Sequence, residues 1–133
     1  MQLELKNNLA EVQRLRLAVE GYCRSLELSD KTIHRITLAM EELITNTVSY
    51  GYQDDDTHII DVTITRHENH LSIDVIDDAG PFDPRDRESE TLEGGLQERP
   101  VGGLGLRLVG YLSDNLEHRN LKPGNHTTLS FNI

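Results

Sequence analysis

The chain has 133 residues and a formal net charge of −10, from 23 acidic and 13 basic residues. This length supports one domain with a hydrophobic core, so we expect a single domain over residues 1–133. The acidic balance argues against direct nucleic-acid binding, which requires a basic surface.

Targeting and cysteine signals are sparse. No apolar run approaches the roughly 20 residues of a membrane-spanning helix, and the first residues lack the layout of a signal peptide. Cys23 is the only cysteine, so neither an internal disulfide nor a multi-cysteine metal site can form. Together these features predict a cytoplasmic protein without a membrane partner.

The first part of the chain predicts a short strand and two helices. Residues 2–6 alternate between polar and apolar, as in an edge strand. Apolar residues then recur at three- and four-residue steps over 9–26 and again over 30–52, which predicts two amphipathic helices. The apolar stripe of the second helix comprises Ile36, Met40, Leu43, Ile44 and Thr47.

Two polar residues stand out within the second predicted helix. Glu42 and Asn46 lie four residues apart and therefore share one helix face. Asparagine is a mediocre helix former, because its amide competes for backbone hydrogen bonds. The pair is either part of a solvated face, or a carboxylate and an amide oxygen directed at a metal and a phosphate.

Two strands are predicted next, over 58–65 and 71–77. Period two places Asp77 on the apolar side of its strand, whereas Asp78 has the opposite parity and can face water. A carboxylate at the end of a buried row is costly unless it is paired. Asp77 is therefore either an acceptor for a buried donor, such as the amine of a purine, or a structural cap of the following turn.

A charged segment without a clear period covers residues 85–101. It is longer than most connections in a compact domain, and we expect it to be a flexible lid. Gly102, Gly103 and Gly105 follow, as a loop that leads into a helix over about 104–114. Glycines at a helix start suit phosphate binding through backbone N–H groups, but they equally suit a plain hinge.

The chain closes with a predicted hairpin, whose strands cover 115–120 and 127–133 around a turn at 122–125. The element order is β-α-α-β-β-lid-α-β-β. Strands that cluster in pairs predict a mixed, mainly antiparallel sheet with helices on one face. The fold class is therefore α+β, a two-layer α/β sandwich.

In this order, the features resemble the GHKL (histidine kinase-like) ATPases, and most of all the anti-sigma-factor serine kinases. The resemblance covers nearly the whole chain. Three segments carry it: an asparagine box, EELITNTVSYGY; a DxGxPFDP box, DDAGPFDP; and a glycine box, GGLGLRLVGYLSD.

The resemblance implies an ATP-binding regulator that uses Mg²⁺. It would transfer the γ-phosphate of ATP to a serine on an anti-anti-sigma (STAS) partner, sequester a sigma factor or a similar target, and form a homodimer. Asn46 would hold Mg²⁺, Glu42 would orient or deprotonate the serine hydroxyl, and Asp77 would accept from the adenine amine. The alternative is a binding module that uses ATP without phosphoryl transfer.

The same resemblance assigns further residues to the nucleotide. The backbone expected to cradle the phosphates comprises Gly103, Leu104, Gly105 and Leu106. The residues expected around the adenine are Ala79 and Phe82, with Thr128 as a weaker candidate. The arginines that are candidates for the γ-phosphate are Arg87, Arg99 and Arg107.

The sequence departs from the family pattern at the second box. Aligned without a gap, Asp77 takes the position of the adenine-binding aspartate, and Ala79 stands where glycine is usual. A shift by one residue would instead use Asp78 and Gly80, but strand parity favours Asp77. We expect Ala79 to crowd the base slightly and to weaken nucleotide affinity.

Overall fold

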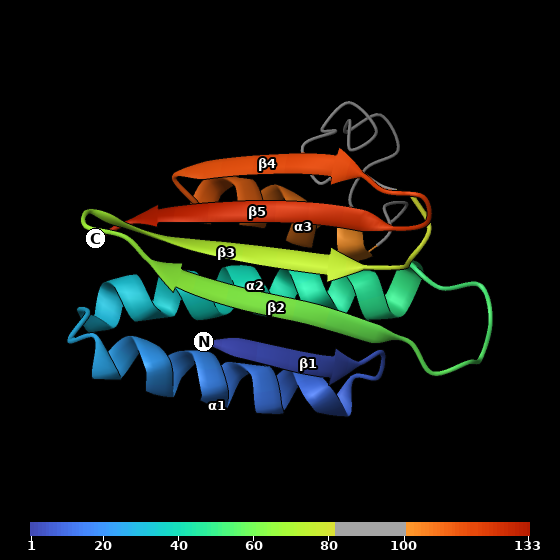
Figure 1. Cartoon of the computed structure of the whole chain (residues 1–133), viewed down its shortest axis with the longest axis horizontal. Coiled ribbons are helices and arrows are strands. Elements are labelled where there is room, and N and C mark those ends of the chain that lie inside the picture. The colour runs from blue at the N-terminus through green and yellow to red at the C-terminus, as the bar shows by residue number, and fades with distance from the viewer. Residues whose placement is uncertain (82–100) are drawn as a thin grey trace.

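The computed structural model describes residues 1–81 and 101–133, and of residues 101–106 only the helical backbone. A sheet lies in front of three helices in Figure 1. The elements in chain order are β1 (Gln2–Lys6), α1 (Ala10–Ser25), α2 (Asp30–Tyr50), β2 (Ile59–Arg66), β3 (His70–Asp77), α3 (Val101–Leu112), β4 (Asn115–Asn120) and β5 (Asn125–Asn132).

The five strands form one sheet in the order β1-β2-β3-β5-β4. Every described pairing is antiparallel, so the sheet is not mixed. Strand β5 lies between β3 and β4, so the last strand of the chain is an interior strand of the sheet. The predicted α+β sandwich is confirmed, and β3 and β5 are the strands that position the site.

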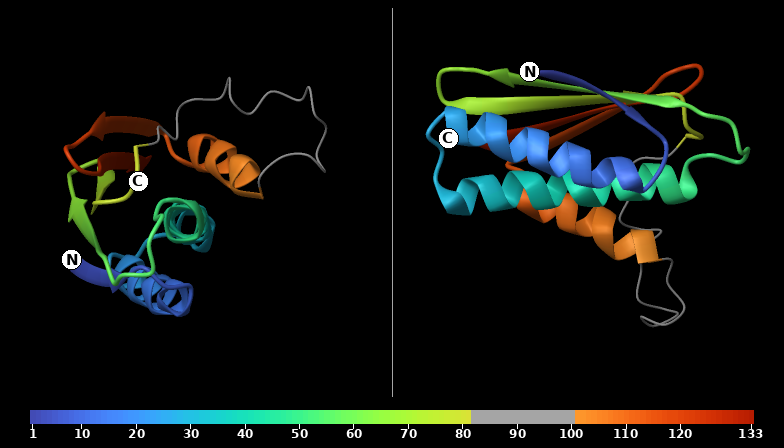
Figure 2. Two further views of the ribbon diagram at one scale, coloured as in Figure 1. Left: turned by 90° about the vertical axis from the view of Figure 1, so that its right-hand side faces the viewer. Right: turned by 90° about the horizontal axis from the view of Figure 1, so that it is seen from below.

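All three helices cover the same face of the sheet, as the two views of Figure 2 show. Ser29 caps α2, because its side chain accepts a hydrogen bond from the Thr32 N–H at 3.2 Å. The apolar stripe predicted for α2 is buried against the sheet. Alternate residues of β2, β3 and β5 meet it and complete the core. Within the described part of the chain, no helix is long and apolar enough to cross a membrane.

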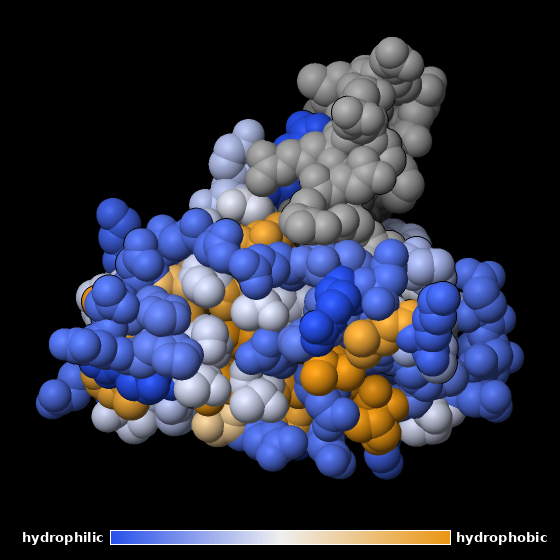
Figure 3. Space-filling model, turned by 45° about the horizontal axis from the view of Figure 1, so that its top comes forward, coloured by the Kyte–Doolittle hydropathy of each residue, from blue (hydrophilic) through white to orange (hydrophobic). Residues whose placement is uncertain are grey.

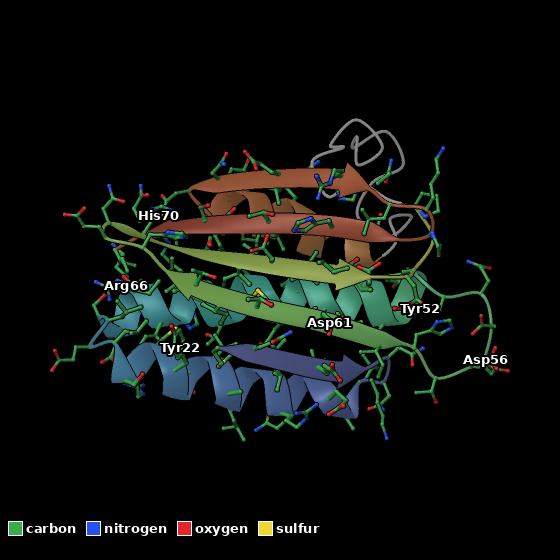
Figure 4. All side chains as sticks on the ribbon, viewed as in Figure 1. Tyr22, Tyr52, Asp56, Asp61, Arg66 and His70 are labelled. Atoms are coloured by element: carbon green, nitrogen blue, oxygen red, sulfur yellow. The ribbon has the colours of Figure 1, made fainter. Side chains whose placement is uncertain are left out.

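The opposite face of the sheet has no helix over it and is mainly polar. Asp61 lies on this face of β2 in Figure 4, and the surface in Figure 3 is largely hydrophilic. The two exceptions are Ile59 and Ile76, which are 42% and 40% exposed. The strands thus have a buried and an open side, and parity decides which residues can reach the helices.

Helix α3 begins earlier than the sequence predicts. Its first residue is Val101, so Gly102, Gly103 and Gly105 belong to its first turns and do not form a loop ahead of it. The expectation failed because glycine was taken to end regular structure, whereas packing of α3 against α2 supplies the missing stability. The remainder of the predicted lid lies outside the described residues.

The β4–β5 hairpin closes tightly on the end of β3. Gly124 has φ +109°, and a Cβ placed on it would lie 1.9 Å from the Asp77 carbonyl oxygen. Only glycine therefore fits at this position. The contact brings Asn125, the first residue of β5, directly opposite Asp77 in the sheet register.

We expect Gly124→Ala to lower the free energy of unfolding by about 2–5 kcal/mol, because it combines an unfavourable φ with a clash against backbone. Gly21→Ala is the matched control. Gly21 lies exposed within α1 with nothing within 4 Å of an added Cβ, so the change should stabilise the fold by about 0.5–1 kcal/mol. Denaturant unfolding of both variants measures the difference, and equal stability of Gly124→Ala and wild type would contradict the close approach.

Candidate functional site

Helix α2 contributes Glu42 and Asn46. Asn46 is only 7% exposed, and its Nδ2 donates to the Glu42 carbonyl oxygen at 2.9 Å. This bond fixes the orientation of the amide, and its Oδ1 accepts from none of the described residues. The Glu42 side chain is half-buried. Asn46 thus presents an oriented oxygen near a carboxylate, which suits a hard cation.

Strand β3 contributes Asp77, which is 5% exposed. Its Oδ1 accepts from the Ala79 N–H at 3.0 Å and from Asn125 Nδ2 at 2.9 Å. Its Oδ2 accepts from none of the described residues. Burial raises the pKa of this carboxyl above its usual value, and the two hydrogen bonds act in the opposite direction. One oxygen of a buried carboxylate is therefore structural, and the other is available to a ligand.

Asp78 points away from this position. Its side chain is 46% exposed, and its Oδ2 lies 2.8 Å from His58 Nδ1. Strand parity therefore predicted correctly which of the two aspartates turns inward. Both aspartates also make structural contacts, Asp78 with His58 and Asp77 with the backbone N–H of Ala79 in the following turn.

The turn after β3 lies against the end of α2. The Gly80 N–H donates to the Gly51 carbonyl oxygen at 2.8 Å. A Cβ on Gly51 would lie 2.8 Å from the Ala79 Cβ. Gly51 is five residues beyond Asn46, which is about 7.5 Å along a helix axis. The structure thus brings the Asp77 turn and the Asn46 amide to the same end of α2.

The start of α3 reaches that end as well. Arg35, near the start of α2, donates through Nε and Nη2 to the Leu112 carbonyl oxygen at 3.1 and 2.8 Å. The two helices therefore run antiparallel (Figure 2). From this contact, Asn46 and Val101 are each eleven residues away along their helices, about 16 Å. The first N–H groups of α3, which have no acceptor within their own helix, thus lie at about the level of Asn46.

Thr128 does not belong to this site. Its Oγ1 donates to Asp74 Oδ1 at 2.8 Å on the open face of the sheet. The inward position belongs to Thr127, which is 1% exposed and shares the face of Asn125. The expectation was wrong because a shift of one residue along a strand moves a side chain to the other face.

Comparison with known proteins identifies the family. The sequence model of the histidine kinase-like ATPase domain matches residues 5–131. The chain belongs to this family. Its fold is also that of two solved structures that are each 16% identical in sequence.

The first solved structure contains the RsbU and RsbW domains of a Mycobacterium tuberculosis protein. The match has a TM-score of 0.66 and covers 98% of this chain and 32% of that one. The second is the histidine kinase domain of a blue-light activated histidine kinase from Erythrobacter litoralis. Its TM-score is 0.57, with 92% of this chain and 59% of that one covered. This chain thus spans about a third of the first solved chain, and both likenesses concern the fold alone.

Curated relatives refine the position within the ATPase family. The serine-protein kinase RsbW of Listeria monocytogenes is 30% identical over 106 residues, which are 77% of this chain and 68% of the relative. RsbW of Oceanobacillus iheyensis is 28% identical over 109 residues, with 79% and 69% covered. The serine/threonine-protein kinase BtrW of Bordetella bronchiseptica is 27% identical over 95 residues, with 71% and 67% covered. Within the ATPase family, the chain groups with these serine-protein kinases.

The remaining candidate nucleotide-binding residues fall into groups by their location in the structure. Those in the backbone of α3 are Gly103, Leu104, Gly105 and Leu106. Those outside the described residues are Phe82, Arg87 and Arg99. Arg107 lies half-buried on α3. The described candidates for the phosphate cradle therefore belong to the positive end of a helix dipole, a suitable place for an anion.

Three residues of this end of the molecule were missed from the sequence: Asn125, Tyr52 and His58. Asn125 has the parity of the buried residues of β5, which was the available signal, but it was assigned to a turn. Tyr52 lies at the end of α2 in Figure 4, and its hydroxyl is buried without a hydrogen-bond partner among the described residues. Burial, and after it the charges of Asp77 and Asp78, raise the pKa of Tyr52.

His58 joins the loop after α2 to the end of β3. Its ring stacks on Tyr52 with centroids 4.4 Å apart, and its Nε2 and Nδ1 each lie 2.8 Å from a carboxylate oxygen, of Asp54 and Asp78 respectively. Carboxylates only accept, so both bonds require the protonated ring. The hydrogen bonds to Asp78 and then to Asp54 raise the pKa of His58.

His58→Gln should therefore reduce stability in a pH-dependent way. The pKa of His58 is higher in the folded state than in the unfolded state, where it is about 6.5. The charged bridge therefore stabilises the fold fully at a pH below the unfolded-state pKa, and this stabilisation is lost as the pH rises through the folded-state pKa. The difference in Tm between wild type and variant should be largest near pH 6 and should shrink toward pH 9. His34→Gln, at an exposed position of α2, serves as control, and a pH-independent difference for His58→Gln would rule out the charged bridge.

Proposed function

We propose that this chain is one ATP-binding domain that phosphorylates a serine on an anti-anti-sigma (STAS) partner and sequesters a sigma factor or a similar target. The observation that supports it best is the meeting of three groups at one end of α2. They are the Oδ2 of Asp77 and the Oδ1 of Asn46, which accept from none of the described residues, and the N-terminal turn of α3. Their order suits a base, a metal and phosphates along one nucleotide.

The proposed contacts to ATP follow from these positions. Asp77 accepts from the adenine amine through Oδ2, since Oδ1 is occupied by Ala79 and Asn125. Thr127 replaces Thr128 as the threonine nearest the base, because it has the inward parity. The backbone at Gly103 and Gly105 binds the phosphates through N–H groups at the start of α3.

The side-chain oxygen of Asn46 is suited to coordinate Mg²⁺. Its Nδ2 is held by a helix carbonyl, so its Oδ1 is fixed in direction and available. A Mg²⁺ ion typically takes one or two protein oxygens and completes its shell with phosphates and water. When bound, the ion neutralises charge on the phosphates, which is much of what phosphoryl transfer requires from a protein.

Glu42 is the proposed base. No described residue donates to its carboxylate or forms an ion pair with it, so it can orient the serine hydroxyl of the partner and accept its proton. The serine oxygen then forms a bond to the γ-phosphorus while the bond from that phosphorus to ADP breaks.

The partner and the cellular setting are proposed from the same resemblance. The net charge of −10 suits a partner surface that carries positive charge. A cytoplasmic homodimer is the expected form, and light scattering tests the oligomeric state.

The decisive experiment incubates the protein with γ-labelled ATP, Mg²⁺ and a purified STAS protein. Label on a serine of that protein supports the kinase. A stable complex that forms with ATP but carries no label supports the alternative, a binding module without phosphoryl transfer. Absence of both ATP binding and complex formation would overturn the proposal.

Asn46→Ala should abolish Mg²⁺-dependent ATP binding, because it removes the amide oxygen that is the proposed Mg²⁺ ligand. Alanine is a better helix former than asparagine, so the unliganded fold should remain intact. Titration calorimetry with and without Mg²⁺ measures the effect, and thermal unfolding without nucleotide is the control. Unchanged affinity in Mg²⁺ would refute the metal assignment.

Glu42→Gln should retain ATP binding and slow phosphoryl transfer by about 10²–10⁴-fold, the usual contribution of a general base. Glu41→Gln is the matched control, because Glu41 faces α1 and lies 3.5 Å from Arg16. Single-turnover transfer to the partner serine measures both variants. A wild-type rate for Glu42→Gln would remove this residue from the mechanism.

A further inference from the structure

Asn125 occupies a special place beside Asp77. It is fully buried, at 0% exposed, and it is the register partner of Asp77 across β3 and β5. Its Nδ2 donates to Asp77 Oδ1 at 2.9 Å and to the Gly80 carbonyl oxygen at 3.0 Å. One amide thus holds the carboxylate and the turn that follows it.

The backbone dictates this contact. Gly124 approaches the Asp77 carbonyl so closely that no side chain fits at that position, and its positive φ turns the chain into β5. The next residue therefore begins β5 opposite Asp77, on the buried face. A short amide is the side chain that can donate to both the carboxylate and the turn carbonyl from there.

The contact also selects one carboxylate oxygen. Asn125 and the Ala79 N–H both donate to Oδ1, at 2.9 and 3.0 Å, so Oδ2 is left for a ligand. Two donors on one oxygen hold the plane of the carboxylate and stabilise its charged form.

We propose that Asn125 is a positioning residue, which holds the Asp77 carboxylate so that Oδ2 accepts from the amine of an adenine nucleotide. This inference rests on the proposed function and adds to it the residue that sets base selectivity. Asn125 does not touch the base itself. It acts through Asp77.

The surroundings make Asp77 sensitive to the loss of this donor. Burial and the nearby Asp78 raise the pKa of Asp77, while Asn125, the Ala79 N–H and the charge of His118 on β4 lower it. The hydroxyl of Tyr52 also lies near Asp77, and the charge of Asp77 raises the pKa of Tyr52. Without Asn125, the pKa of Asp77 rises further. A protonated carboxyl no longer offers the same acceptor to an amine.

The test compares ADP with its analogue that lacks the 6-amino group, by calorimetry near pH 6.5 and pH 9. Wild type should prefer ADP at both values. Asn125→Leu should lose about 10- to 100-fold of this preference near pH 6.5, the usual value of a hydrogen bond to a charged group. The loss should be smaller near pH 9 than near pH 6.5, because a higher pH favours the ionised form of a carboxyl whose pKa is raised. General damage to the fold would not depend on pH in this way.

Asn132→Leu is the matched control, since Asn132 lies exposed at the other end of β5. Asn125→Ala removes the same donor with less bulk and should show the same pH dependence if the leucine variant does not fold. An Asn125 variant with the wild-type preference at both pH values would overturn the inference. Equal affinity of wild type for both ligands would instead overturn the role proposed for Asp77 and leave the kinase proposal to its own test.

Discussion

A carboxylate that is removed from water has to be compensated, and Asp77 is the carboxylate around which this structure is arranged. It is 5% exposed, and donors from two separate segments meet it, the Ala79 N–H and the Asn125 amide. An uncompensated charge here would cost several kcal/mol, comparable with the whole stability of a small domain. The β4–β5 hairpin, the turn after β3 and the end of α2 are therefore fixed relative to one another by the same requirement. A ligand that binds to Asp77 meets a site that is already organised.

Much of the fold could be predicted, because periodicity reports burial directly. The apolar steps of α1 and α2 and the alternation of β2 and β3 are consequences of facing a core, and the structure buries those residues. The inward position of Asp77 followed from the same rule, two residues beyond Val75. Glu42 and Asn46 were selected as candidates by their helix spacing together with a residue type that helices disfavour, and their role remains a proposal. These signals are local, and a single sequence contains them.

The errors occurred where the answer depended on contacts between distant segments. The choice of Thr128 is an exception, because the alternation of Leu129 and Phe131 along β5 already places Thr127 on the inward face. Helix α3 starts at Val101 because packing against α2 outweighs the low helix propensity of its glycines. Asn125 was assigned to a turn on its residue type, and its partner Asp77 lies 48 positions away in the chain. His58 and Asp78 are likewise 20 positions apart.

Ala79 shows how a departure from a family pattern can be accommodated locally. From the sequence, its methyl group was expected to crowd the base. In the structure, the methyl group faces the end of α2. A Cβ added to Gly51 would lie 2.8 Å from this methyl group and 2.5 Å from the Thr47 carbonyl oxygen. The space for the methyl group thus comes from the glycine that ends α2, and the two residues form one packing unit. Because the Gly80 N–H binds the Gly51 carbonyl oxygen in the same place, this unit also fixes the distance between the turn that carries Asp77 and the helix that carries Asn46. A larger residue at either position would change that distance, and with it the alignment of the proposed base and metal contacts.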